Sequence, residues 1–362
     1  MSKARIIKLG IIGCGGIAFG KHMPALAQIE NVQMVAFCDI IGEQAENACK
    51  QYGCEGAKTY VDYHEMLKDE SIEVIHVCTP NRSHADISVA ALESDKHVMC
   101  EKPMAINYQD AKRMLDASVN TGKKLTIGYQ NRYREDSTAL HQMCGNGDLG
   151  DIYFAKALAI RRRAVPTWGV FLNEKEQGGG ALVDIGTHSL DLTLWMMNNY
   201  KPKYVVGNTY RKIADQKNTA NAWGEWDPTQ FTVEDSAFGF ITMQNGATIM
   251  LESSWALNAL EIGEAETVLC GTKAGADMKG GLRINSVEHN QQFTKEISKD
   301  KKTVAFFGKK TDNSALTEAK YWINAIINDT APLVKPEQAI VVTQILDAIY
   351  ESAKTGKPVY FD

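Results

Sequence analysis

The sequence lacks any apolar stretch of the roughly 18 residues needed to cross a membrane. The apolar part of its first segment, MSKARIIKLGIIG, is short and interrupted by glycine, which speaks against a signal peptide. The eight cysteines are scattered and include no C-x-x-C pair, so neither a disulfide framework nor a zinc site is expected. These absences predict a cytoplasmic protein with reduced thiols.

Long blocks of basic residues are also lacking. The longest run is Arg161–Arg163, and the formal net charge is -5, which argues against a nucleic-acid-binding face. Apolar residues make up 44% of the chain and charged residues 23%, which is ordinary for a globular protein. A chain of 362 residues is long enough for two domains.

The first third of the chain alternates strand-like and helix-like segments. Short continuous apolar runs, which are typical of strands buried on both faces, occur at 6–13, 33–39, 73–80, 96–103 and 124–129. Segments with helical spacing, such as 43–53 and 84–95, lie between them. Strands that alternate with helices pair in parallel through right-handed crossovers. We therefore expect residues 1–127 to form a Rossmann domain, an α/β fold with a doubly wound parallel sheet.

The first strand of this domain runs into a glycine-rich turn. Gly13, Gly15 and Ala18 form a G-x-G-x-x-A pattern, with Gly16 and Ile17 between the last two. The first glycine allows a tight turn, the second lets the backbone approach a pyrophosphate, and the small third residue lets helix and strand pack closely. The free N–H groups of the following helix favour phosphate. The alternative is a glycine turn that only connects two elements.

A carboxylate at the end of the second strand adds to this pattern. Asp39 follows the apolar run 33–39 and can accept hydrogen bonds from both ribose hydroxyls of a dinucleotide. Its charge would repel a 2′-phosphate, and Ile40, Ile41 and Gly42 after it offer no group to hold one. NAD is therefore predicted as the cofactor, and NADP is less favoured.

Polar residues also follow the third and fourth apolar runs. In an open parallel sheet, ligands bind beyond the carboxyl ends of the strands. A proline after Lys102 restricts that residue to an extended conformation, which would direct the lysine toward the nicotinamide end of the cofactor. The alternative is a lysine in a surface turn. The residues predicted to bind cofactor here are Thr79, Pro80, Asn81, His84, Glu101 and Lys102.

Residues 128–362 show a different pattern. A long strand is expected at 151–161, and 235–255 reads as a hairpin with Asn245-Gly246 as a two-residue turn. Strand-like residues at 266–275 add to these antiparallel signals. We expect an α+β domain on a large, mostly antiparallel sheet with helices on one side, which binds substrate and mediates oligomerisation. The alternating Phe238 and Phe240 are expected to face the core, and a place in an interface is the alternative.

The segment GGGALVDIGTHSLDLTLWMM places two functional side chains at helical spacing. Asp184 and His188 are four residues apart, so on a helix they share one face. Leu190, Leu194 and Met197 form a stripe that should face the core. A metal site would need a third ligand, and none is evident nearby, so no metal is predicted. The alternative is a purely structural hydrogen bond between Asp184 and His188.

Three motifs now stand in a fixed order: the turn Gly13–Ala18, the E-K-P of residues 101–103, and the D-x-x-x-H that starts at Asp184. With them the sequence resembles, over its whole length, the glucose-fructose oxidoreductase/inositol dehydrogenase (Gfo/Idh/MocA) family. The resemblance implies that Lys102, Asp184 and His188 form the catalytic set of an NAD(P)-dependent dehydrogenase acting on CH–OH groups. It also implies subunit contacts through an open sheet face, hence a homodimer or homotetramer.

The chemistry of such a set follows from the residue types. Hydride loss from a secondary alcohol requires a base, and a histidine with a pKa of about 6.5 suits that role. Lys102 can stabilise negative charge on the same oxygen, and Asp184 can orient a neighbouring hydroxyl. Whether Lys102 or His188 takes the proton stays open, because the two can titrate as a coupled pair.

The substrate is predicted from fewer signals. Arginines and a tryptophan that follow the strand at 151–161 suit a sugar or cyclitol, and an anionic group is an alternative. These could instead be a solvated charge run beside a buried tryptophan. Two rival functions are an NAD-using glycoside hydrolase with transient substrate oxidation and a non-enzymatic dinucleotide sensor. The residues predicted to contact substrate, besides the catalytic set, are Asn131, Arg132, Arg161, Arg163 and Trp168.

Overall fold

The computed structural model describes residues 5–297 and 314–361. These residues form two compact units. The first unit contains the chain up to Gln130 and a later segment from helix α9 (Ser314–Ile327) to Ile340. The second unit contains the chain from Asn131 to β14 and again from Val341 onward. Our predicted domains were 1–127 and 128–362.

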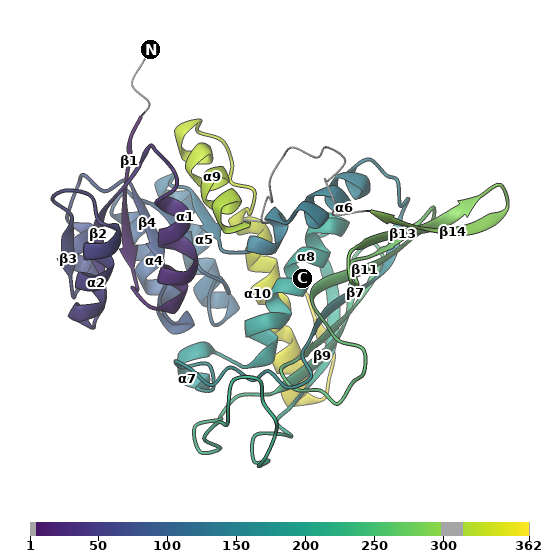
Figure 1. The fold of residues 1–362 in the computed structure, drawn as a ribbon. Coiled ribbons are helices and arrows are strands. Elements are labelled where there is room, and N and C mark those ends of the chain that lie inside the picture. The colour runs from purple at the N-terminus through teal and green to yellow at the C-terminus, as the bar shows by residue number, and fades with distance from the viewer. Residues whose placement is uncertain (1–4, 298–313, 362) are drawn as a thin grey trace, which may run out of the picture. The chain divides into compact units, whose positions relative to one another are not determined.

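The first unit is built on a six-stranded parallel sheet (Figure 1). Its strand order is β3-β2-β1-β4-β5-β6, so the direction of winding reverses between β1 and β4. The five expected strands are present, which confirms the predicted Rossmann sheet; the short edge strand β3 was not predicted. The strands are β1 (Ile7–Ile12), β2 (Val32–Cys38), β3 (Lys58–Tyr60), β4 (Val74–Val77), β5 (His97–Cys100) and β6 (Leu125–Ile127).

Helices of the first unit cover this sheet in pairs, with α4 against α5 and α1 against α9. Helix α9 comes from the far end of the sequence, and its Trp322 joins the core formed by β1, β2 and α1. The helices are η1 (Ala18–His22), α1 (Met23–Leu26), α2 (Gly42–Tyr52), α3 (Tyr63–Leu67), η2 (Asn81–Ser83), α4 (His84–Glu93) and α5 (Tyr108–Thr121).

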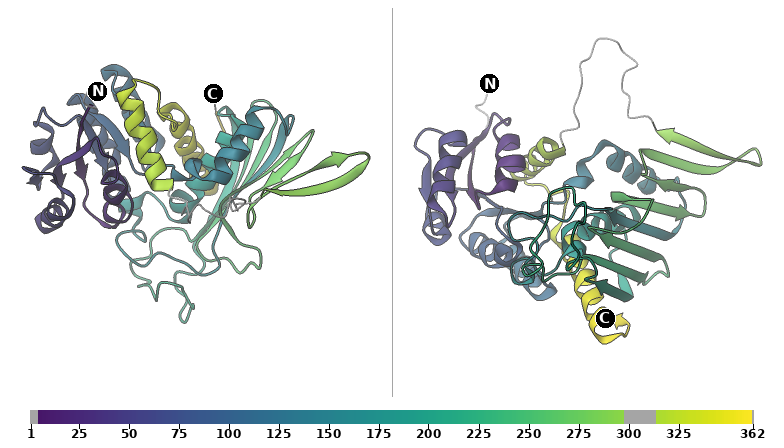
Figure 2. Two further views of the ribbon diagram at one scale, coloured as in Figure 1. Left: turned by 45° about the horizontal axis from the view of Figure 1, so that its top comes forward. Right: turned by 60° about the horizontal axis from the view of Figure 1, so that its bottom comes forward.

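The second unit is built on a nine-stranded sheet in the order β14-β13-β12-β11-β7-β10-β9-β8-β15. Every pairing is antiparallel except that between β7 and β10, which confirms the expected mostly antiparallel sheet. Its β13–β14 hairpin extends beyond the other strands (Figure 2). The strands are β7 (Ile152–Ile160), β8 (Pro202–Tyr210), β9 (Ser236–Met243), β10 (Thr248–Ser254), β11 (Gly263–Gly271), β12 (Gly275–Asp277), β13 (Leu282–Glu288), β14 (Gln291–Ile297) and β15 (Val359–Tyr360).

One face of this sheet is covered by helices. Helix α8 (Thr187–Met197) packs on β7 and β11, and α10 (Pro336–Thr355) approaches Gly207 and Gly239 so closely that added Cβ atoms would lie within 3 Å of Ile349. Shorter helices are η3 (Gln130–Tyr133), α6 (Glu135–Gly145), α7 (Glu174–Gln177) and η4 (Leu182–Gly186).

The opposite face of the sheet carries exposed apolar side chains. Val206, Phe240 and Met250 are paired across β8, β9 and β10, and they are 39%, 43% and 38% exposed. The prediction that Phe240 faces the core is therefore wrong. The alternation along β9 was correct, but alternation alone does not determine which face the helices cover.

The hairpin expectation needs correction, whereas the expected burial of Leu190 and Leu194 is confirmed. The hairpin loop has three residues rather than two: Met243 and Ala247 pair across it, and Gly246 adopts a positive φ of 87°, as in a bulged hairpin. Helix α8 is not amphipathic, because all of Thr187–Met196 is buried. Some of its polar groups form hydrogen bonds inside the unit, such as the one from Thr193 to Thr267. No helix of the described chain is both long and apolar enough to cross a membrane.

Candidate active site

The glycine-rich turn lies where the winding of the first sheet reverses. Gly13 has a φ of +89°, and a Cβ there would lie 2.7 Å from the backbone of Cys78, so the turn requires glycine. Added Cβ atoms at Gly15 and Gly16 would meet no protein atom within 4 Å. Helix begins at Gly16, and Ile17 and Ala18 continue it. The backbone here is open to a phosphate group and leads into a helix N-terminus.

Asp39 fixes this turn to the end of β2. Its Oδ2 accepts a hydrogen bond from the N–H of Cys14 at 2.8 Å, and its Oδ1 accepts one from Ile41 at 2.9 Å. Ile40 beside it is 91% exposed. The remaining lone pairs of the carboxylate can accept ribose hydroxyls, so this edge of the sheet fits an NAD molecule.

The loops after β4 and β5 are tied together by a buried histidine. His84 lies at the start of α4, with Nδ1 2.8 Å from the carbonyl oxygen of Pro103 and Nε2 3.0 Å from that of Thr79. Burial lowers the pKa of His84, so the neutral ring has one N–H and donates to one of these two carbonyls; it has no exposed surface to offer a cofactor. Thr79 Oγ1 is buried without a hydrogen-bond partner in the described protein, a group that a bound cofactor can satisfy. Pro80 is exposed, and Asn81 starts the short helix η2.

Glu101 is buried in a cluster of charged and polar side chains that the sequence did not predict. Its Oε1 accepts hydrogen bonds from Lys21 Nζ at 2.7 Å and His22 Nε2 at 2.8 Å, while Oε2 accepts the backbone N–H of Lys102 at 3.1 Å. Burial alone would raise the pKa of Glu101, but Lys21 and His22 hold it well below its usual range. Glu101 thus anchors the residue that follows it, and the Lys102–Pro103 peptide bond is cis.

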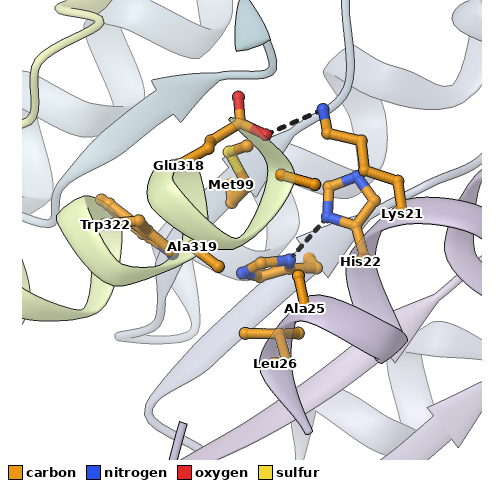
Figure 3. A pocket seen from close by; sticks show the side chains of 10 residues that line it. Lys21, His22, Ala25, Leu26, Met99, Glu318, Ala319 and Trp322 are labelled. Carbon is orange, nitrogen blue, oxygen red and sulfur yellow. Dashed lines mark hydrogen bonds and ion pairs between the residues drawn. The ribbon is translucent and has the colours of Figure 1, made fainter. Parts of the chain in front are cut away.

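The same cluster extends to α9, as Figure 3 shows. Lys21 Nζ lies 2.9 Å from Glu318 Oε2, and His22 Nδ1 lies 3.0 Å from Nδ1 of His76, with the two rings nearly perpendicular. These residues line a small cavity together with Trp322. Burial, and then the charge of Glu101, raise the pKa of Glu318. Lys21 therefore forms ion pairs with two buried carboxylates, those of Glu101 and Glu318. The sequence feature that could have indicated this cluster is the basic pair Lys21 and His22 in an otherwise apolar helical segment.

In the second unit, Asp184 and His188 lie on one continuous helical segment. Asp184 is in η4 and is partly exposed, and His188 is in the first turn of α8 and is 9% exposed. The indole of the buried Trp255 donates a hydrogen bond from Nε1 to Asp184 Oδ2 at 2.9 Å. Trp255 therefore orients this carboxylate, a role that no local pattern in the sequence indicated.

The residues predicted to bind substrate in the second unit differ in accessibility. Trp168 is 51% exposed and lies edge-to-face with Trp223, their ring centroids 4.8 Å apart. Arg161 lies over the Trp223 ring and pairs with Glu264. Arg163 donates to Asn258 at 2.6 Å. The two tryptophans are exposed and both arginines are half-buried with polar partners, so this is not a simple solvated charge run beside a buried tryptophan.

Arg132 does not belong to that surface. It has no exposed area, and its guanidinium forms a two-bond ion pair with the buried Asp191 of α8, at 2.9 and 2.6 Å. Burial opposes its charge, yet the Asp191 carboxylate keeps its pKa above the usual value. A side chain without exposed surface cannot reach a substrate, so we exclude Arg132 from the substrate site. Asn131, its neighbour, is partly exposed in η3. No cluster of three metal-ligating side chains occurs among the described residues.

Comparison with known proteins covers both units. Residues 7–129 match the model of an oxidoreductase family with an NAD-binding Rossmann fold, and residues 141–361 match the C-terminal alpha/beta domain of the same family. Among curated relatives, D-glucoside 3-dehydrogenase of Escherichia coli K12 is 35% identical over 355 residues, which is 98% of this chain and 97% of that protein. The inositol 2-dehydrogenase of Salmonella typhimurium LT2 is 32% identical over 198 residues, 54% of this chain and 56% of the relative.

Solved structures agree on the fold. An aldose-aldose oxidoreductase from Caulobacter crescentus, complexed with glycerol, aligns with a TM-score of 0.79 at 22% identity, covering 99% of this chain and all of the other. A levoglucosan dehydrogenase in complex with NADH and levoglucosan gives a TM-score of 0.83 at 20% identity, covering 98% and 99%. With both domain models matched in order, the chain belongs to the Gfo/Idh/MocA family of NAD-binding oxidoreductases.

Proposed function

We propose that this protein is an NAD-dependent dehydrogenase that oxidises a secondary hydroxyl of a sugar or cyclitol. The observation that carries the proposal is the glycine turn, fixed to Asp39 and open at Gly15 and Gly16, in a chain similar over its whole length to a D-glucoside 3-dehydrogenase. The inositol 2-dehydrogenases among its relatives extend the substrate class to cyclitols.

In the proposed reaction, NAD supplies the hydride acceptor when it is bound. Lys102 stabilises negative charge that develops on the substrate oxygen. His188 is proposed to take the hydroxyl proton; it lies in the first turn of α8, and Asp184 lies in η4 just before it. Asp184, held by Trp255, orients a neighbouring hydroxyl of the substrate. The proposal leaves either Lys102 or His188 as the formal base.

Substrate recognition is proposed to use exposed and half-buried residues of the second unit. The indole face of Trp168 suits the C–H surface of a sugar ring. Arg161, Arg163 and Asn131 supply hydrogen-bond donors for hydroxyl groups. On the cofactor side, the Asp39 carboxylate favours NAD over NADP, and the open turn at Gly15 and Gly16 holds the pyrophosphate.

The proposal is tested by a screen of sugars, glycosides and polyols with NAD, following the absorbance of reduced nicotinamide. Net reduction with a hexoside or an inositol is expected. Release of the aglycone without net reduction would instead support transient oxidation during glycoside hydrolysis. Tight NAD binding with no turnover of any substrate would support a dinucleotide sensor.

We further propose that the protein is cytoplasmic and assembles as a homodimer or homotetramer. The support is the row of exposed apolar side chains on the face of the second sheet opposite α8 and α10, represented by Val206, Phe240 and Met250. A second copy of the same chain would remove this apolar surface from water. Light scattering at micromolar concentration decides between a monomer and an oligomer.

A further inference from the structure

A buried carboxylate lies at the beginning of the helical segment that carries Asp184 and His188. Glu234, two residues before β9, is 8% exposed. Its Oε2 accepts the backbone N–H of Gly180 at 2.8 Å, and its Oε1 accepts the N–H of Leu182 at 2.9 Å. The hydroxyl of Tyr350 on α10 donates to the same Oε1 at 2.9 Å. All three donors converge on one side chain.

Three glycines, Gly178–Gly180, allow the backbone to come this close to Glu234 and Tyr350. A Cβ on Gly179 would lie 2.0 Å from the Tyr350 hydroxyl, and a Cβ on Gly180 would lie 1.9 Å from the carbonyl oxygen of Glu234. Gly178 before them has a φ of +78°. The three successive glycines therefore let the backbone lie against Glu234, which no residue with a side chain would allow.

The bonded amides lie at the start of a helix: Gly180 directly precedes it, and Leu182 is in its first turn. The first four N–H groups of a helix have no partner within it, and a carboxylate is the most favourable acceptor for them. From Leu182 the helix continues through η4 and α8, so Asp184 and His188 follow within two turns. The Ser253 hydroxyl adds a bond to the Ala181 carbonyl at 2.8 Å. The position of both functional side chains thus depends on how this first turn is held.

We propose that Glu234 is a positioning residue for the reaction: its carboxylate holds the first turn of the helix and thereby sets where Asp184 and His188 stand. The inference rests on the proposed function of those two residues. Glu234 itself touches neither substrate nor cofactor in this role. Its ionised form accepts three hydrogen bonds, and protonation turns one of its oxygens into a donor that faces an N–H group.

Protonation of Glu234 falls in the working range of an enzyme. Burial raises its pKa to about 7, against the bonds from Leu182, Gly180 and Tyr350, which favour the charged form. The titratable group that faces it from α10 is Tyr350, whose own pKa is raised far above its usual value by burial and by Glu234, with Asp347 adding to the effect. Neighbouring Asp235 is engaged with the backbone of Lys212 and Ile213.

The test is Glu234→Gln, which keeps the size of the side chain and removes the charge. We expect kcat to fall about 10- to 100-fold, the loss typical of small misplacement, with NAD affinity unchanged. In the wild type, kcat/KM should decline as pH falls through about 7. In Glu234→Gln the decline near pH 7 should be smaller, because the glutamine cannot take up a proton. Hydrogen exchange at the amides of Gly180 and Leu182 should accelerate.

The matched control is Thr193→Val on the same helix. It removes a buried hydrogen bond to Thr267 and costs stability, but it leaves the first turn intact. Its pH profile and the exchange of both amides should remain those of the wild type. A loss of the pH limb in this control as well would mean that general destabilisation is responsible, and would overturn the proposal.

A second variant keeps the question decidable if Glu234→Gln fails to fold. Tyr350→Phe removes one donor and leaves both backbone bonds, so the pKa of Glu234 should rise and the acid limb should move to higher pH. An acid limb of the pH profile that stays unchanged in Tyr350→Phe would overturn the proposal. So would a Glu234→Gln variant in which amide exchange is faster but kcat stays within twofold of the wild type. If no sugar is oxidised at all, the proposed function fails, and the amide exchange still shows whether Glu234 holds the helix.

Discussion

The carboxylate of Asp39 accepts a hydrogen bond from the backbone N–H of Cys14 at 2.8 Å. One side chain therefore connects the glycine-rich turn after β1 to the end of β2. The same group is proposed to bind the ribose of NAD, so it both shapes the phosphate-binding backbone and selects the cofactor. Because these roles share one carboxylate, a substitution at Asp39 tests them together.

Asp39→Ala should weaken NAD binding about 10-fold or more, because a charge-assisted hydrogen bond is lost. NADP binding should change far less, since removal of the negative charge relieves repulsion of the 2′-phosphate. Titration calorimetry with both cofactors measures the ratio. Glu43→Ala, which removes an exposed carboxylate at the start of α2, serves as the control and should leave the ratio unchanged. A wild type that prefers NADP would contradict the reading.

Lys102→Met should lower kcat by roughly 10²–10³-fold, the loss seen when one donor to a developing oxyanion is removed. The dissociation constant of NAD should change little, because the glycine turn and Asp39 hold the dinucleotide. His188→Ala should lower kcat to a comparable extent. The kcat of the double variant should be no lower than that of the less active single variant, since the residues act as one unit. Steady-state kinetics decide it; a kcat within a few-fold of wild type would remove Lys102 from the mechanism.

Lys21→Met should destabilise the fold by about 3–5 kcal/mol, because it leaves Glu101 and Glu318 buried without their cation. The loss should shrink at acidic pH, where the unpaired carboxylates take up protons. Urea unfolding at several pH values measures it. Lys96→Met is the matched control: that lysine is also buried, but its Nζ donates only to the backbone carbonyl of Asp69, so its removal should cost less. Equal losses at both positions would contradict the ion-cluster account.

Glu234 should make the protein less stable as pH rises. Its pKa is about 7 in the folded protein against 4.5 for an ordinary glutamate, so the folded state binds the proton more tightly. The contribution of protonated Glu234 to the free energy of unfolding is fully present below pH 4.5. It is lost as pH rises from 4.5 through 7, a change of about 3 kcal/mol. The free energy of unfolding of the wild type, relative to Glu234→Gln, should fall over that range. A difference that is constant with pH would show that Glu234 titrates as it does in the unfolded chain.

Phe240→Lys should disrupt the proposed assembly, because it places a charge in the middle of the exposed apolar row between Val206 and Met250. Light scattering should then give a 40.0 kDa particle in place of a multiple of that mass. Val119→Lys, at a similarly exposed apolar position on α5, should leave the assembly intact. A wild type that is already monomeric at micromolar concentration would contradict the proposal.

Features that depend only on residues adjacent in sequence were predictable from the sequence alone. The turn Gly13–Ala18 and the strand before it are local: glycine is needed where φ is positive, and a continuous apolar run buries both faces of a strand. The helical spacing of Asp184 and His188 likewise predicted a helix here, and the structure places both residues on the continuous segment formed by η4 and α8. These patterns were sufficient for the Rossmann sheet, the cofactor and the family.

Only the tertiary structure showed which distant groups meet. Lys21 and Glu101 are 80 residues apart in sequence, and Gly180 and Glu234 are 54 apart, so no local spacing relates them. The same holds for Phe240: period-two alternation divides β9 into two faces, but the packing of α8 and α10 decides which face is buried. Local patterns in the sequence determined the glycine turn and most strands, while hydrogen bonding and burial between segments depend on the path of the whole chain.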